Sequence, residues 1–392
     1  MKADHSREQH IAVFGESGSG KTVLLSSFYG AEMYRGEREA EALYRLHVPD
    51  TGQGRRLRQI YLGMKQEDAV PVANRFKSAT FTFQVDPKAT ENTKAVKRRD
   101  FNSLRLVWHD YPGEWFENSP SSPTEEQRRI DTFRSLLNSN VALILVDAQQ
   151  LAEYPREESR YLKSLFGNIE NTLLSLKKSI LEDGERLERF PRIWMFALSK
   201  ADLIPEMTVQ DFRDLMILRA AGDIERLQEV LSEFIVGDEA LSVGEDFLRL
   251  SSAEFHPNGI NVDRRIGLNQ ILPLAAILPL ERHLRWARTQ EVPRKVLDSL
   301  LGPGLELGSA VLGRVLRGLP TSKGPLGMAQ KLLNSIISSD AFEEYSKLAG
   351  ERLRRSNQAA REQGDQMRAI LTQFKIDLEN GENENVILRG ER

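Results

Sequence analysis

The chain has 392 residues, of which 40% are hydrophobic and 28% are charged, and its formal net charge is −3. These values are ordinary for a soluble globular protein of one large or two smaller domains. The near-neutral charge gives no overall field that would attract nucleic acid or an anionic membrane. The chain has no cysteine, which excludes disulfides, thiolate metal sites and cysteine nucleophiles.

The first ten residues are polar and lack the apolar run of a signal peptide. The longest apolar run, Ile271–Leu280, contains two prolines. It is shorter than the ~20 residues that a membrane-spanning helix needs. We therefore expect a cytoplasmic protein.

Apolar runs and turn residues predict strands that alternate with helices along the chain. The predicted strands are Ile11–Phe14, Ala79–Val85, Leu104–Trp108, Val141–Val146, Ile193–Leu198 and Phe247–Leu250. Helices are predicted over about 22–34, 157–187 and 209–234, whereas the charged stretch 35–77 shows no clear element. Because continuously apolar strands alternate with helices, we expect a three-layer α/β/α fold with a mostly parallel sheet.

We expect residues 8–285 to form one domain and residues 286–377 to form a helical extension. Glycine and proline cluster in 302–327, and Met367, Ile370, Leu371 and Phe374 fall on one face of a predicted helix over 342–374. Residues 378–392 are polar, and we expect a flexible tail there.

Two stretches could be taken for interaction sites. The basic run that includes Lys94, Lys97, Arg98 and Arg99 fits a solvated hairpin tip better than a nucleic-acid patch. Leu297–Leu319 is apolar, but its glycines and Pro303 favour docking onto the first domain over a helix lying on a membrane.

A glycine-rich motif follows the first predicted strand. It matches GxxxxGK[ST] throughout, with the residues Gly15, Glu16, Ser17, Gly18, Ser19, Gly20, Lys21 and Thr22. Such a loop turns backbone N–H groups towards nucleotide phosphates, its lysine reaches the β- and γ-phosphates, and its threonine hydroxyl binds Mg²⁺. A flexible glycine–serine turn would share this composition, but the flanking strand and helix favour the P-loop.

A second motif, Asp110-Tyr-Pro-Gly113, ends the strand that begins at Leu104. An aspartate there can hold Mg²⁺, and Gly113 can offer its N–H to the γ-phosphate because it has no Cβ. We therefore expect Thr22 and Asp110 as metal ligands, and Lys21 and Asp110 in the catalytic site. DxxG alone is common in turns, so the prediction rests on its position after the P-loop.

The stretches GKTVLLSS and DYPGEW resemble the bacterial YcjX-like P-loop NTPases and the related double-GTPase members of the translation-factor-related class of GTPases. The resemblance spans roughly residues 8–285 through four short motifs, and it implies a nucleotide-hydrolysing G domain of P-loop NTPase fold. The wider class often has a water-orienting glutamine after DxxG. Glu114 stands in that place, so it is our candidate to position or deprotonate water; a solvated glutamate is the alternative.

Two motifs after later strands favour guanine over adenine. Ser199-Lys200-Ala-Asp202 corresponds to the [NT]KxD element of the GTPase class with serine first, and Leu250-Ser251-Ser252-Ala253 is similar to its SA[K/L] element. An aspartate can accept hydrogen bonds from both N1–H and N2–H₂ of guanine, while a lysine stem packs on the ring. Both motifs are weak alone, and an ATPase of the same fold remains the alternative.

The first-switch threonine of the YcjX-like pattern is missing. The stretch Val70–Arg75 holds none; Thr51 and Thr80 are the nearest, with Thr80 expected inside a strand. No arginine can be assigned as an arginine finger among Arg35, Arg55, Arg56, Arg58 and Arg75. We therefore expect a GTPase switch that is slow or activated by a protein partner or self-association, with a nucleotide-binding scaffold as the alternative.

Overall fold

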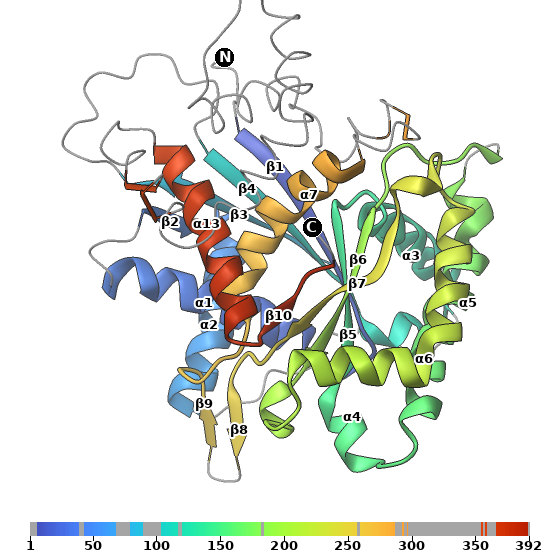
Figure 1. Cartoon of the computed structure of the whole chain (residues 1–392), viewed down its shortest axis with the longest axis horizontal. Coiled ribbons are helices and arrows are strands. Elements are labelled where there is room, and N and C mark those ends of the chain that lie inside the picture. Colours follow the sequence, from blue (N-terminus) through green and yellow to red (C-terminus); the bar gives the residue numbers. More distant parts are fainter. Residues whose placement is uncertain are drawn as a thin grey trace, which may run out of the picture.

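A mixed eight-stranded sheet runs through the molecule in the order β10-β7-β6-β5-β1-β4-β3-β2 (Figure 1). The structure is a computed structural model that describes residues 6–38, 43–67, 79–88, 103–116, 120–181, 184–256, 259–286, 292–293, 296, 354–355, 357–358 and 366–390. The strands are β1 Ser6–Phe14, β2 Tyr44–His47, β3 Ala79–Pro87, β4 Ser103–Asp110, β5 Val141–Asp147, β6 Ile193–Ser199, β7 Ser242–Arg249 and β10 Ile387–Leu388. The pairs β1–β4, β1–β5, β5–β6 and β6–β7 are parallel, and the other pairs are antiparallel.

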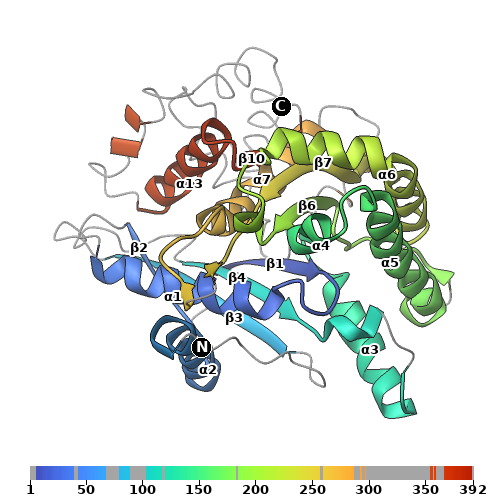
Figure 2. The ribbon, with the colours of Figure 1, turned by 90° about the horizontal axis from the view of Figure 1, so that it is seen from below.

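Helices cover both faces of this sheet. They are α1 Lys21–Arg38, α2 Thr51–Glu67, α3 Pro123–Leu136, α4 Ala148–Glu153, α5 Glu158–Ile180, α6 Val209–Ser232, α7 Ile271–Trp286 and α13 Gln366–Asn383. Figure 2 shows α1 beside α2, and α5 beside α6. The expected α/β architecture with a mostly parallel sheet and helices on both sides is therefore confirmed.

Two hydrophobic cores lie on the two faces. Along β1, Ile11 and Val13 join the core with α1, α7 and α13, whereas Ala12 and Phe14 join the core with α3, α5 and α6. This division follows from the strand geometry, because successive side chains point to opposite faces. Every residue of β5 and β6 is buried, as their continuous apolar sequences predict.

The chain changes direction at β1. After β1 the chain forms β2, β3 and β4, all on one side of that strand, and the next strand, β5, lies on the other side. The helix after β1 packs on one face, and the helix after β4 packs on the opposite face. In open α/β sheets, ligands bind outside the carboxyl ends of the strands at such a switch point.

The stretch 35–77, for which the sequence showed no clear element, contains the end of α1, the strand β2 and the helix α2. Leu57, Tyr61 and Met64 are buried on α2 at helical spacing, yet arginines and glycines surround them in sequence. Tertiary packing therefore identifies this helix: a Cβ at Gly30 of α1 would lie 2.3 Å from the Tyr61 ring, so the two helices are in close contact.

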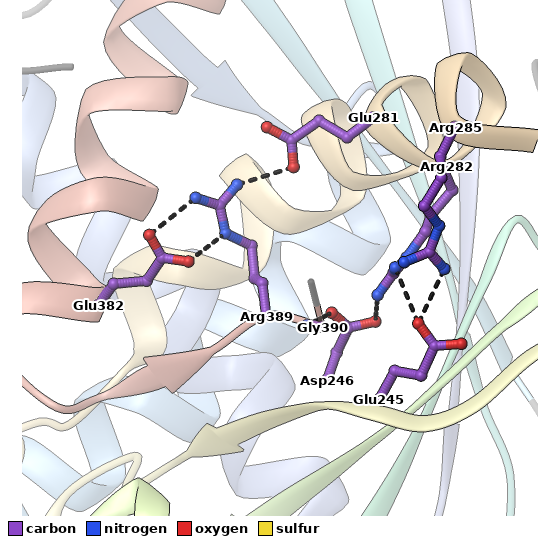
Figure 3. Close-up of polar contacts among 8 residues, drawn as sticks. All are labelled: Glu245, Asp246, Glu281, Arg282, Arg285, Glu382, Arg389 and Gly390. Atoms are coloured by element: carbon purple, nitrogen blue, oxygen red, sulfur yellow. Dashed lines mark hydrogen bonds and ion pairs between the residues drawn. The ribbon is translucent and has the colours of Figure 1, made fainter. Parts of the chain in front are cut away.

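The expectation of a flexible tail from residue 378 is wrong up to residue 390. Residues 378–383 belong to α13, and β10 pairs with β7 at the sheet edge. Arg389, whose side chain is 2% exposed, bonds Glu281 of α7 at 2.7 Å and Glu382 of α13 at 2.8 Å (Figure 3). Pairing of the charges, which polar composition alone does not reveal, holds this segment in place.

A second ion-pair group anchors the same segment to the sheet (Figure 3). Asp246 of β7 is fully buried, accepts a bond from Arg282 at 2.5 Å and accepts another from the Gly390 N–H at 3.0 Å. Glu245 accepts bonds from Arg282 at 3.0 Å and Arg285 at 2.8 Å. We call this group, with Arg389 and its two carboxylates, the C-terminal clasp.

Several expectations lie outside the described residues: the basic run around Lys94, the stretch Val70–Arg75, the apolar stretch Leu297–Leu319, and most of the helical extension 286–377. Within the described part of the chain, no helix combines the length and apolarity needed to cross a membrane. The run Ile271–Leu280 forms the buried first part of α7 instead.

Candidate functional site

The sequence motifs gather along one edge of the sheet. Because β1, β4, β5, β6 and β7 are parallel, the residues that follow them lie at the same edge. The glycine-rich loop Gly15–Gly20 follows β1, Asp110 ends β4, and Ser199 ends β6. The motifs, which are far apart in the chain, therefore lie along the same edge of the sheet, on both sides of the switch point.

The glycine-rich loop curls around the side chain of Lys21. Gly18 and Gly20 adopt φ values of 80° and 91°, which favour glycine, and the loop then enters α1 at Lys21 and Thr22. The Lys21 ammonium donates to the carbonyl oxygens of Gly15 at 2.6 Å and Glu16 at 2.9 Å. An ammonium inside a loop at a helix N-terminus creates a positive position suited to an anion.

One buried hydroxyl in this loop has no hydrogen-bond partner in the described part of the chain. Ser19 is 3% exposed, and its Oγ forms no hydrogen bond with any residue the structure describes. Buried hydroxyl groups usually have a partner. An anion held in the loop would provide one for Ser19.

The turn after β4 packs directly on the glycine-rich loop. A Cβ on Gly113 would lie 2.4 Å from the Ser17 nitrogen and 2.5 Å from the Glu16 carbonyl carbon. The buried Tyr111 hydroxyl accepts a 3.0 Å hydrogen bond from the Gly15 N–H. The two motifs therefore form one unit, and a side chain at position 113 would separate them.

Asp110 lies in a buried, positively charged environment. It is 5% exposed, and burial raises its pKa to about 6, although Lys21 and Arg56 act to lower it. Burial disfavours the carboxylate, and a nearby cation stabilises it. A divalent cation at this carboxylate would therefore relieve an electrostatic cost.

His109, which precedes Asp110, is buried at the end of β4. Its Nε2 lies 3.2 Å from Nδ1 of His10, and its Nδ1 lies 3.4 Å from the Thr80 hydroxyl. Burial, together with the nearby His10, lowers the His109 pKa to about 4, and Glu8 opposes this shift. Thr80 lies within β3 as expected, and its hydroxyl faces His109.

Glu114 and Trp115 lie in the one-turn helix Gly113–Phe116. Trp115 is 5% exposed, its carbonyl accepts a 3.2 Å hydrogen bond from Arg129, and the guanidinium lies 5.6 Å from its ring centroid. Glu114 is half-buried beside Gly113. The tryptophan anchors the turn, while the glutamate remains accessible at the site.

The residues after β6 form a second group. Lys200 adopts a left-handed conformation with φ 53°, and its ammonium bonds the Asp147 carboxylate at 2.7 Å and the Gln149 side-chain oxygen at 2.8 Å. Asp147 also accepts from the Gln149 N–H at the start of α4. The lysine is thus held at the ends of β5 and β6.

Asp202 is oriented by the residues after β7. The Ser251 hydroxyl, which is buried, lies 2.6 Å from an Asp202 carboxylate oxygen and 2.8 Å from the Ala253 carbonyl oxygen. Ser252 and Ala253 continue this turn, and Ala253 is buried. The two predicted base-recognition motifs therefore lie together.

Helix α5 connects the two groups. Asn168 donates a 3.0 Å hydrogen bond to the Glu16 side chain, and the Tyr161 hydroxyl accepts a 2.8 Å bond from the Asp147 N–H. Residues seven apart lie on one helix face. One face of α5 thus contacts both the glycine-rich loop and the end of β5.

Sequence analysis missed three residues that hold the site: Tyr111, Asp147 and Ser251. Each had a sequence signal, because each lies at the end of an apolar strand or inside a named motif. Their partners are 96, 53 and 49 residues away, and only the tertiary structure shows those distances.

One carboxylate and one hydroxyl of the motifs are the groups that could hold Mg²⁺. Among the described residues, no three histidine or acidic side chains gather as a metal cage. Mg²⁺ bound with phosphates needs only one or two protein carboxylates. The buried Asp110 carboxylate and the Thr22 hydroxyl at the start of α1 match that requirement.

A cavity of about 530 Å³ lies elsewhere, between α1, α2, the loop before α7 and α13. None of its described lining residues belongs to the motifs; its charged members are Glu32, Lys65, Asp263, Arg265, Asp377 and Glu384. Carboxylates and bases mix there, and Lys65 lies 3.7 Å from Asp263. The chemistry of the motifs therefore lies outside this cavity.

Comparison with known proteins adds no assignment. No protein-family model matches this chain, and no curated protein matches its sequence.

Proposed function

We propose that this chain is a P-loop GTPase that binds GTP with Mg²⁺ at the loop Gly15–Thr22. The observation that carries the proposal is the contact between the two phosphate motifs: Gly113 packs on the backbone of Glu16 and Ser17, beside Lys21 and Asp110. The strand order, with β1 at the switch point, also supports a P-loop NTPase fold.

Each residue of the loop has a defined task in this proposal. The loop N–H groups and the Lys21 ammonium hold the β- and γ-phosphates, and Ser19 supplies a further hydroxyl. Thr22 and Asp110 hold Mg²⁺, which when bound neutralises charge on the phosphate oxygens. Gly113 lets its N–H approach the γ-phosphate, and Glu114 positions the attacking water.

Guanine recognition is proposed for the second group. Asp202 accepts hydrogen bonds from the guanine N1–H and N2–H₂, and the Ser251 hydroxyl holds its carboxylate in position. The Lys200 stem packs on the base while Asp147 holds its ammonium. The N–H groups of Ser252 and Ala253 donate to the guanine oxygen in this proposal. Adenine lacks the matching donor pair.

Titration calorimetry with GTP and ATP tests the base. We expect GTP to bind more tightly, and Asp202→Asn to weaken GTP binding by about 10²-fold while leaving ATP binding unchanged. Asp214→Asn on the exposed side of α6 is the matched control. A preference for ATP that is indifferent to Asp202→Asn would contradict the guanine assignment.

A turnover assay distinguishes a GTPase from a nucleotide-binding scaffold, the alternative that the missing switch threonine leaves open. Phosphate release that is lost in Lys21→Ala and Glu114→Ala, and kept in the exposed control Lys178→Ala, supports hydrolysis. Tight binding without phosphate release at any protein concentration would support a scaffold. A rate that rises with concentration would support activation by self-association.

A further inference from the structure

The helix α2 presents three arginines in different directions. Leu57, Tyr61 and Met64 form its buried face. An α-helix turns by about 100° per residue, so Arg55 points away from that face, while Arg56 and Arg58 lie at its two opposite edges. The exposure of Arg55, Arg56 and Arg58 agrees with this placement.

Contacts identify which edge faces the site. Gln53, one turn before Arg56 on the same edge, donates a 2.9 Å hydrogen bond to the Thr80 carbonyl of β3. The neighbouring residue Ala79 pairs with Asp110 across the sheet. The edge of α2 that carries Gln53 and Arg56 therefore lies over the end of β4.

Electrostatics agree with this geometry on both edges. Arg56 is one of two cations, with Lys21, that act on Asp110 against the effect of burial. Arg58 acts instead on Tyr29 of α1, on the other edge. Arg56 is exposed and forms no ion pair with the residues the structure describes, so its guanidinium is available to a ligand at Asp110.

We propose that Arg56 is a catalytic residue that contacts the γ-phosphate in cis and stabilises the charge that develops during hydrolysis. This inference rests on the proposed GTPase function and assigns the arginine that the sequence alone left unassigned. Arginine suits the task because its planar fork of donors matches phosphate oxygens and its charge is permanent.

The reaction is a balanced displacement. The water oxygen bonds to the γ-phosphorus while the bond from that phosphorus to the β–γ bridging oxygen breaks. The bridging oxygen leaves with the electron pair on GDP, and the water proton passes to phosphate or solvent. Arg56 donates hydrogen bonds to the oxygens on which negative charge accumulates, and so lowers the barrier.

Two readouts on the full chain test this role. At saturating GTP, we expect Arg56→Ala to lower kcat by about 10³-fold, with the Kd for GDP within about threefold of the wild-type value. We also expect GDP-bound wild-type protein to form a complex with aluminium fluoride, detected by fluorine NMR, and Arg56→Ala to fail to form it. Arg56→Lys should recover part of both, because it keeps the charge without the fork.

Arg55→Ala and Arg58→Ala are matched controls, because they remove the same charge from the same helix. The proposal is overturned if Arg56→Ala matches these controls both in kcat and in formation of the aluminium fluoride complex. An equal loss of GDP binding would overturn it too, since Arg56 would then act in ground-state binding. If wild-type protein releases no phosphate, the proposed GTPase function fails, whereas the aluminium fluoride complex still tests Arg56 separately.

Discussion

Gly113→Ala tests the contact on which the proposed function depends. The new Cβ would lie 2.4 Å from the Ser17 nitrogen, whereas ordinary van der Waals contact begins at 3.4 Å. Both neighbours are backbone atoms, so no flexible side chain can move aside, and the turn must retreat from the loop by about 1 Å. The turn would then hold its N–H and Glu114 away from the γ-phosphate.

The size of the expected effect follows from that displacement. A misplacement of about 1 Å costs roughly 10²-fold in rate, or about 2.7 kcal/mol of transition-state stabilisation. We therefore expect Gly113→Ala to lower kcat about 10²-fold. The Kd for GDP should stay within about threefold, because the turn does not reach the β-phosphate in this proposal, and any preference for GTP over GDP should decrease.

Single-turnover phosphate release and calorimetric titration with GTP and GDP measure these quantities. Gly222→Ala on α6 is the matched control, because a Cβ there meets no atom within 4 Å. It should leave turnover unchanged and stabilise the protein by up to about 1 kcal/mol through helix propensity. Wild-type turnover and an unchanged ratio of GTP to GDP affinity in Gly113→Ala would refute the reasoning.

Three further predictions concern the surroundings of the site. Arg389→Met should lower the free energy of unfolding in urea by about 2–3 kcal/mol, because two partly exposed carboxylates lose their shared cation; no loss would mean that the C-terminal clasp is not a stabilising contact. Burial raises the pKa of Glu245, but the nearby arginines Arg282 and Arg285 outweigh burial, so the pKa lies below the ordinary value. The ionised Glu245 therefore contributes to stability above about pH 4.5, and this contribution is lost as the pH falls. The melting temperature of wild type should accordingly fall more steeply below pH 5 than that of Glu245→Gln, and parallel curves would contradict this. Asp147→Asn should weaken GTP binding about tenfold, measured by calorimetry, because it keeps the cap of α4 but removes the carboxylate that holds Lys200; unchanged affinity would exclude that role.

Much of the central sheet could be read from the sequence. The runs that become β5 and β6 are continuously apolar, and the structure buries every residue of both strands. A strand buried on both faces has no position for polar residues, so it can be predicted from its own sequence without knowing which elements pack against it. The positions of the glycine-rich loop, Asp110 and Ser199 at strand ends follow from the same pattern.

Other elements depend on contacts that local sequence does not encode. The helix α2 is rich in arginine and glycine, and packing of Tyr61 against Gly30 identifies it. The segment 378–390 is polar, yet the pairing of Arg389 with Glu281 of α7, 108 residues away, holds it in place. Polar composition predicts flexibility only when the charges lack distant partners.

The sequence by itself predicted which residues would bind phosphate, Mg²⁺ and a base, because glycines, a lysine, a threonine and two aspartates with suitable groups stand at the ends of predicted strands. The tertiary structure decided which of them lie together. It places Gly113 on the backbone of Ser17, Ser251 on Asp202 and Arg56 among the charges that act on Asp110. The physical reason is the parallel sheet, which brings together strand ends that are far apart in the chain. Burial at that edge strengthens the electrostatic interactions between the charged groups there.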